Sequence, residues 1–153
     1  METIIFDKAK YHFTGNFPKE LDNYQGYVHT GFYIGWLVWK ELISEYFKEE
    51  AKEGIQQFAD MQMTAVKLYE EYLDGVFSSD ELNEEGLKFT KAYFDFENGK
   101  YMKDFYVVLA SDLPSAYHVL DTWENFGKIA AAIDQRYEGG KKDPDFLKLY
   151  LQK

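Results

Sequence analysis

Three histidines, His12, His29 and His118, are the residues of this chain best suited to proton transfer or metal binding. Neutral imidazole is the commonest metal ligand and the usual general base near neutral pH. No two of the three have the spacing of a ligand motif such as HExxH, so the sequence itself predicts no metal site. If the three imidazoles lie close together in the fold, with an acid such as Asp121 beside them, they would form a pocket for a small molecule or a metal ion. The spacing favours the alternative that they are structural or surface residues.

A second candidate is the segment from Glu70 to Glu85, which holds seven acids and no lysine or arginine. Interleaved apolar residues would give this segment anchors within an acidic surface, which suits charge-assisted pairing with a basic partner. The alternative is a solvated acidic turn whose acids favour the start of the next helix. The residues expected to form the binding face are Glu70, Glu71, Asp74, Phe77, Asp80, Glu81, Glu84 and Glu85.

The sequence lacks the residues and motifs of several common kinds of catalytic and cofactor site. There are no cysteines, which excludes disulfides, thiolate nucleophiles and cysteine-based metal sites. There is no GxSxG, phosphate-binding loop, GxGxxG or EF-hand pattern, so no cofactor is expected. Adjacent acids on a helix point about 100° apart and do not converge as an acid and a base.

A net charge of −10 disfavours nucleic acids and anionic membranes and leaves cations, basic peptides and basic proteins as partners, of which a basic protein is the one expected. The N-terminus lacks the basic start and apolar run of a signal peptide. The longest apolar run, from Gly31 to Trp39, is far short of the ~20 residues that span a bilayer. We therefore expect a cytoplasmic protein.

The length of 153 residues fits one domain over residues 1–153, and 46% of the residues are hydrophobic, enough for one core. The periodicity predicts an all-α, single-domain bundle of about six helices. Residues 1–29 should be irregular, with a short extended segment in "KYHFTGNF", and residues 140–153 should form a C-terminal closing helix.

The helix expected at the centre of the bundle runs from Thr30, a candidate N-cap, to about Ser44 or Phe47. It is apolar on every side, yet it contains Gly31 and Gly35 one turn apart. Interior glycine costs about 1 kcal/mol relative to alanine, so the pair predicts close packing of another segment against one face. The alternative is a groove that admits a ligand, beside the three histidines.

Further helices are expected over the following segments: 45–61; 64–75, capped by Thr64; 79–97, capped by Ser79; and 121–139, with Asp121 and Glu124 at capping-box spacing. The segment around Phe105 to Leu109 fits either a helix or a strand.

Four blocks of the sequence resemble a family of small bacterial proteins described as a domain of unknown function. They are "YHFTGNFPKEL", "YVHTGFYIGWLVWKELIS", "DGVFSSDELNEEGLKFTKAYF" and "LPSAYHVLDTWENFGKIAAAIDQRY", from about Ala9 to Tyr137. The resemblance implies a bacterial, cytoplasmic origin and supplies no catalytic residues. It extends in a general way to small acidic immunity proteins that neutralise toxins, which is an analogy only.

Two function classes follow. The sequence favours a protein-binding module, immunity- or inhibitor-like, with its acidic face on a basic partner, and it leans away from an enzyme. The alternative is a small-molecule or metal-dependent enzyme with a His-lined pocket at His12, His29, His118 and Asp121.

Overall fold

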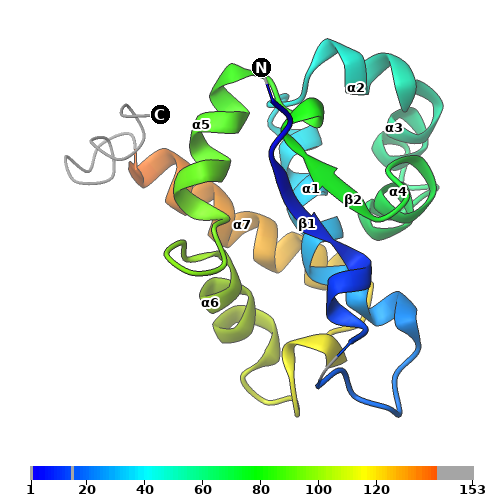
Figure 1. The fold of residues 1–153 in the computed structure, drawn as a ribbon, viewed down its shortest axis with the longest axis vertical. Coiled ribbons are helices and arrows are strands. Elements are labelled where there is room, and N and C mark those ends of the chain that lie inside the picture. The colour runs from blue at the N-terminus through cyan, green and yellow to red at the C-terminus, as the bar shows by residue number, and fades with distance from the viewer. Residues whose placement is uncertain (1, 15, 141–153) are drawn as a thin grey trace.

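The computed structural model describes residues 2–14 and 16–140, which form seven α-helices and one two-stranded antiparallel sheet (Figure 1). The helical prediction is confirmed in outline, but an all-α fold is wrong because the sheet is present. The predicted closing helix over residues 140–153 lies outside the described residues beyond Gly140. The elements are β1 (Ile5–Lys8), α1 (Val28–Trp39), α2 (Glu45–Glu50), α3 (Lys52–Ala59), α4 (Ala65–Tyr72), β2 (Val76–Ser78), α5 (Glu84–Tyr93), α6 (Tyr101–Phe105) and α7 (Trp123–Gly140).

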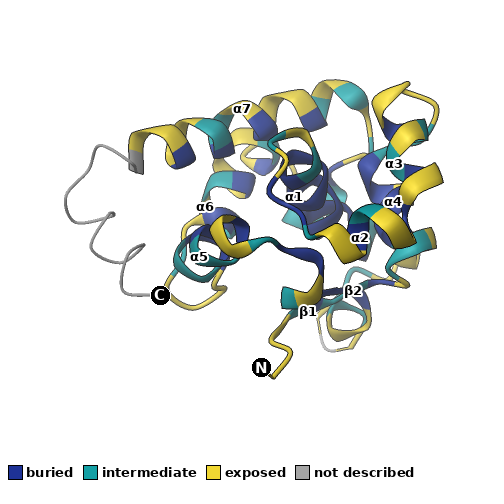
Figure 2. Cartoon of the chain, turned by 90° about the horizontal axis from the view of Figure 1, so that it is seen from above, coloured by how far each residue is buried: buried dark blue, intermediate teal, exposed yellow. Residues whose placement is uncertain are grey.

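Helix α1 lies at the centre of the molecule, and its residues from Val28 to Leu37 are all buried (Figure 2). This confirms the expected central helix but moves its boundaries. The helix begins two residues before Thr30, whose hydroxyl donates to the Asp7 carboxylate instead of capping the helix. It ends at Trp39 because Lys40 closes the last turn and Glu41 adopts a positive φ of 58°.

Close packing of α4 against α1 explains the two glycines in the central helix. A Cβ atom on Gly31 would lie 2.7 Å from Cα of Val66. A Cβ atom on Gly35 would lie 2.5 Å from Cβ of Ala65 and 2.7 Å from the ring of Phe126. The groove is therefore filled by α4 and α7, which confirms the packing interpretation and excludes a ligand from that position.

The sheet joins the N-terminal segment to a segment that the sequence suggested was an exposed connection. Strand β1 pairs antiparallel with β2, with Ile5 opposite Ser78, Lys8 opposite Val76 and a bulge between Ile5 and Asp7. The strands have four and three residues, too short for an alternating pattern to stand out in the sequence.

Several predicted helix starts move by a few residues. Thr64 caps α4 as expected by accepting from the backbone N–H of Lys67 at 3.2 Å. Ser78, not Ser79, caps a single 3-10 turn, and α5 begins later with Asn83 as its cap. At the start of α7, Thr122 rather than Asp121 accepts from the backbone N–H of Asn125. The segment after Ser44 divides at Ala51 into α2 and α3.

The segment left open between helix and strand is helical. Helix α6 continues as a π-helix, η4 (Tyr106–Ala110). Asp104 of α6 accepts two hydrogen bonds from Arg136 of α7, both at 2.9 Å, and one from the Tyr93 hydroxyl at 2.7 Å. These contacts connect α5, α6 and α7.

Alanine substitutions at the glycines of α1 should destabilise the protein. Gly31→Ala forces a Cβ atom against the backbone of α4, and we expect a loss of about 1–3 kcal/mol in the free energy of unfolding, measured by urea denaturation. The matched control is Gly127→Ala in α7, where nothing lies within 4 Å of the added atom. That variant should be neutral or more stable by up to about 1 kcal/mol. Equal effects at both positions would contradict the packing explanation.

The Asp104–Arg136 pair should give a pH-dependent contribution to stability. Burial raises the pKa of Asp104, but the hydrogen bonds from Arg136 and Tyr93 outweigh it and hold the pKa below its usual range. A lowered carboxyl pKa stabilises the folded state above the unfolded value of about 3.9, and this stabilisation is lost as the pH falls below it.

Arg136→Gln should therefore cost about 1–2 kcal/mol at pH 7 and less at pH 3, measured by urea denaturation at both values. The control is Lys128→Gln, which breaks an exposed pair with Glu124 on the same helix and should cost under about 0.5 kcal/mol. An Arg136→Gln effect of the same size at both pH values would rule out the Asp104 contribution.

Candidate functional site: a buried Asp–His–His cluster

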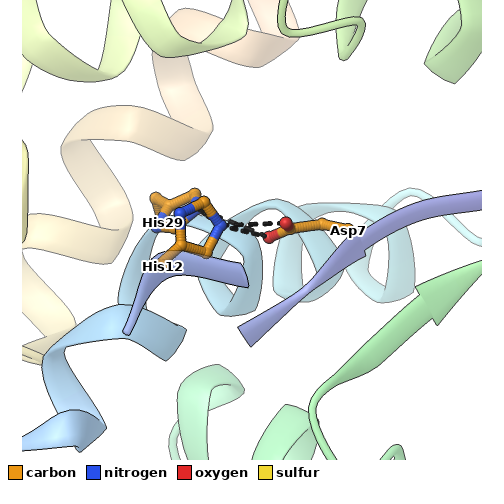
Figure 3. A group of neighbouring side chains, drawn as sticks. All are labelled: Asp7, His12 and His29. Atoms are coloured by element: carbon orange, nitrogen blue, oxygen red, sulfur yellow. Dashed lines mark hydrogen bonds and ion pairs between the residues drawn. The ribbon is translucent and has the colours of Figure 1, made fainter. Parts of the chain in front are cut away.

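Asp7, His12 and His29 converge on one point in the interior (Figure 3). The Nε2 atom of His12 lies 2.9 and 3.1 Å from the two carboxylate oxygens of Asp7. The Nε2 atom of His29 lies 3.1 Å from the His12 Nε2 atom and 3.4 Å from the Asp7 carboxylate. The three side chains thus direct their ligand atoms at one another.

Each of the three residues comes from a different element. The bulge in β1 precedes Asp7, whose side chain is buried beside α1. A 3-10 helix, η1 (Ala9–His12), then turns the chain so that the imidazole of His12 contacts the carboxylate of Asp7. His29 lies in the first turn of α1 and is carried into the interior by that helix. Three segments that share no sequence pattern therefore build the cluster.

The electrostatics favour an ionised carboxylate beside a neutral imidazole. Burial raises the pKa of Asp7, but hydrogen bonds from His12 and His29 outweigh it, so the pKa lies well below its usual range. Burial lowers the pKa of His29, and this effect exceeds the opposing influence of Asp7. A neutral His29 imidazole carries one lone pair suited to binding a metal ion.

With Asp7 ionised, the two Nε2 atoms and the carboxylate lie so close together that their contacts compete for hydrogens. If both Nε2 atoms carry hydrogens, two N–H groups lie side by side with their nitrogens 3.1 Å apart. If either Nε2 atom is deprotonated, its lone pair faces the carboxylate of Asp7, an acceptor, at 2.9–3.4 Å. A cation placed among the three groups removes this conflict, since it attracts every lone pair that points toward it.

The spacing of the three groups fits a first-row transition-metal ion. The ligand atoms all lie within 4.8 Å of one another. Bonds of about 2.0–2.1 Å in tetrahedral geometry separate neighbouring ligand atoms by roughly 3.3 Å. The contacts of 2.9–3.4 Å lie close to that value. Two imidazoles favour zinc, iron, nickel or copper over magnesium and calcium, which prefer oxygen ligands.

Neighbouring side chains hold the three groups in orientation. The Tyr117 hydroxyl lies 2.9 Å from Nδ1 of His12, so that an Nδ1–H donated to it leaves the His12 Nε2 lone pair free. The Thr30 hydroxyl donates to Asp7 at 2.5 Å. The Tyr101 hydroxyl donates to the backbone carbonyl of His29. Partners of this kind normally fix the ligands of metal sites.

Of the four residues predicted for a His-lined pocket, the structure brings together His12 and His29. The ring nitrogens of His118 instead contact Ser115 at 2.8 Å and Glu20 at 3.1 Å. Asp121 accepts from the Tyr24 hydroxyl at 2.6 Å and from the Thr64 hydroxyl at 2.7 Å. Neither belongs to the cluster.

Asp7 is the residue that the sequence did not single out. It lies five residues before His12 and 22 before His29 on a strand too short to recognise, so no spacing signal could have found it.

The predicted acidic face needs correction at two residues. Phe77 on β2 is fully buried among other aromatic rings and cannot anchor a partner. Glu81 is buried too, because its carboxylate accepts from the backbone N–H and hydroxyl of Ser78. Glu85 accepts from Tyr137, and Glu70 pairs with Lys67 at 3.1 Å. The others, Glu71, Asp74, Asp80 and Glu84, are exposed. Binding of a basic partner by these acids stays a prediction.

The fold and the cluster define a helical domain with an internal Asp–His–His site. The chain belongs to the family described as a domain of unknown function (DUF7832), whose model matches residues 5–119. This range includes Asp7, His12, His29 and Tyr117. No curated protein and no solved structure matches the chain. Among the described residues, no helix has the length and apolar character needed to cross a membrane.

Removal of the Thr30 hydroxyl should lower the free energy of unfolding, because the buried Asp7 carboxylate loses a hydrogen-bond donor. Thr30→Val keeps the shape of the side chain but leaves Asp7 without one of its donors, and we expect a loss of about 1.5–3 kcal/mol in the free energy of unfolding. Thr30→Ser, which retains the donor, is the matched control and should lose less than Thr30→Val. Urea denaturation at pH 7 measures both, and equal stabilities would show that the hydrogen bond contributes little.

Proposed function

We propose that this protein is a metal-dependent enzyme that binds a divalent zinc-class ion through Asp7, His12 and His29. The observation that supports it is the convergence of two imidazole Nε2 atoms and one carboxylate within 2.9–3.4 Å at a buried point. Of the two function classes that the sequence leaves open, the sequence alone favours the other, a protein-binding module. The site geometry now argues for a metal-dependent enzyme more strongly than the exposed acids argue for a protein-binding module.

Three protein ligands leave one coordination position for water or substrate, as in catalytic rather than structural zinc sites. A zinc-class ion in such a site supplies a water nucleophile near neutral pH and polarises a carbonyl or phosphoryl oxygen. Asp7 contributes one negative charge, so the site with a divalent ion keeps a net charge near +1. That charge favours an electron-rich or anionic group of a substrate.

The accessible side of the site is the side of His12. The His12 side chain is 15% exposed, whereas those of Asp7 and His29 are 1–2% exposed. The rings of Phe96 and Tyr117 lie against His12, with centroids 6.1 and 5.7 Å away. A substrate therefore approaches past these two rings, and Asp7 and His29 are shielded from bulk water.

Zinc titration tests the proposal. Protein treated with a chelator and then dialysed should bind one equivalent of zinc by calorimetry, and its melting temperature should rise with zinc concentration because the ion binds the folded state. His12→Gln should weaken zinc binding by more than about 100-fold, beyond the 10–100-fold typical of losing an outer partner.

The third histidine provides the control. His118→Gln removes an imidazole outside the cluster and should leave zinc affinity unchanged. Tyr117→Phe should lie between the two, with a loss of about 10–100-fold. Circular dichroism shows whether each variant folds. Wild-type protein that binds no zinc, or binding that depends equally on His12 and His118, would refute the proposal.

A further inference from the structure

A surface hollow of ≈ 410 Å³ is lined by one residue that also contacts the two histidines of the Asp–His–His cluster. This residue is Phe96, in the turn after α5. Its ring centroid lies 6.1 Å from that of His12 and 6.2 Å from that of His29, and the residue also lines the hollow. The volume falls within the range of small-molecule sites, about 300–1,000 Å³.

The walls of the hollow suit a flat apolar group. Phe6, Phe94 and Phe96 line it, with Phe94 5.1 Å from Phe96 and 6.5 Å from Phe6 between ring centroids. Phe96 is 44% exposed, so part of its ring is open to a ligand. A planar ligand group would cover exposed aromatic surface here and gain offset or edge contacts with the rings.

A lysine at the hollow is available for an anionic group. Lys91 lies in the last turn of α5 and lines the hollow. Among residues 2–14 and 16–140, no carboxylate lies within ion-pair distance of its ammonium group, whereas Lys88 on the same helix pairs with Glu84. Asp95 also lines the hollow, and its carboxylate accepts hydrogen bonds within its own turn from the Glu97 backbone N–H and the Asn98 side-chain amide. Glu97 also lines the hollow, and its charge disfavours ligands with more than one negative charge.

We propose that this hollow binds the substrate, a small molecule that carries one flat apolar group and one carboxylate. The flat group lies on Phe96, the carboxylate pairs with Lys91, and the rest of the molecule reaches past Phe96 toward the ion. The inference rests on the proposed function, because it places the ligand beside a metal held by Asp7, His12 and His29. It adds a substrate class, which the ligand cluster alone does not define.

N-benzoylglycine is a suitable probe because it has a phenyl ring, an amide and one carboxylate. Titrated into zinc-loaded protein and followed by NMR, it should shift the backbone amides of Lys91 and Phe96. Lys91→Gln should weaken its binding at least fivefold. Lys88→Gln, which changes a lysine one turn away that already has a partner, should leave its binding unchanged. Benzylamine, with the same ring and the opposite charge, should bind more weakly.

Cobalt substitution tests whether the hollow adjoins the ion. Paramagnetic cobalt in place of zinc should strongly enhance relaxation of the bound probe's protons. Absence of probe binding, equal effects of the two lysine variants, or no enhancement with cobalt would each overturn this inference, and zinc binding measured on the same samples would then leave the proposed function standing. Failure to bind zinc or cobalt would refute the proposed function, and probe binding to the metal-free protein would still show whether the hollow takes this ligand class.

Discussion

The contact between α1 and α4 at Gly31 and Gly35 determines where the rest of the chain lies. Because two residues without side chains allow Ala65 and Val66 to approach within van der Waals distance of the α1 backbone, α1 is buried from Val28 to Leu37. Enclosure extends to its first turn, which carries His29 and Thr30 into the interior with their polar atoms. A buried polar group without a partner is costly, so this turn requires polar partners from elsewhere in the chain.

Asp7 provides a polar partner for this turn. Its own carboxylate then needs hydrogen-bond donors, because burying a carboxylate costs folding free energy unless it is well hydrogen-bonded. Asp7 accepts a hydrogen bond from the Thr30 hydroxyl and lies against both imidazoles. His12 in turn contacts the Tyr117 hydroxyl. The network therefore connects β1, η1, α1 and the 3-10 helix η5 (Ala116–His118). The chain before α1 looked irregular in the sequence, yet these contacts and the pairing with β2 give it a defined position.

The sequence predicts the parts of this structure that depend on local patterns. The apolar run of α1, its glycine pair and the Thr64 cap all follow from residue type and spacing, and the structure confirms them. The parts that depend on distant contacts could not be predicted. Strands β1 and β2 are too short to show a period, and each is defined only by the other. Phe77 and Glu81 lie in an acidic segment, and only tertiary packing shows that they are buried.

The cluster is difficult to explain as a device for stability alone. Apolar residues of similar volume often stabilise a core as well as or better than a buried ionic group does. Here, moreover, an ionised carboxylate and two imidazole nitrogens compete for few hydrogens within 2.9–3.4 Å. The site is also asymmetric, since Asp7 and His29 lie on elements packed into the core, whereas His12 and Tyr117 lie on short 3-10 helices at its edge. A fixed pair of ligands with a third on the solvent side can hold an ion and leave one coordination position open toward Phe96 and the hollow beyond it.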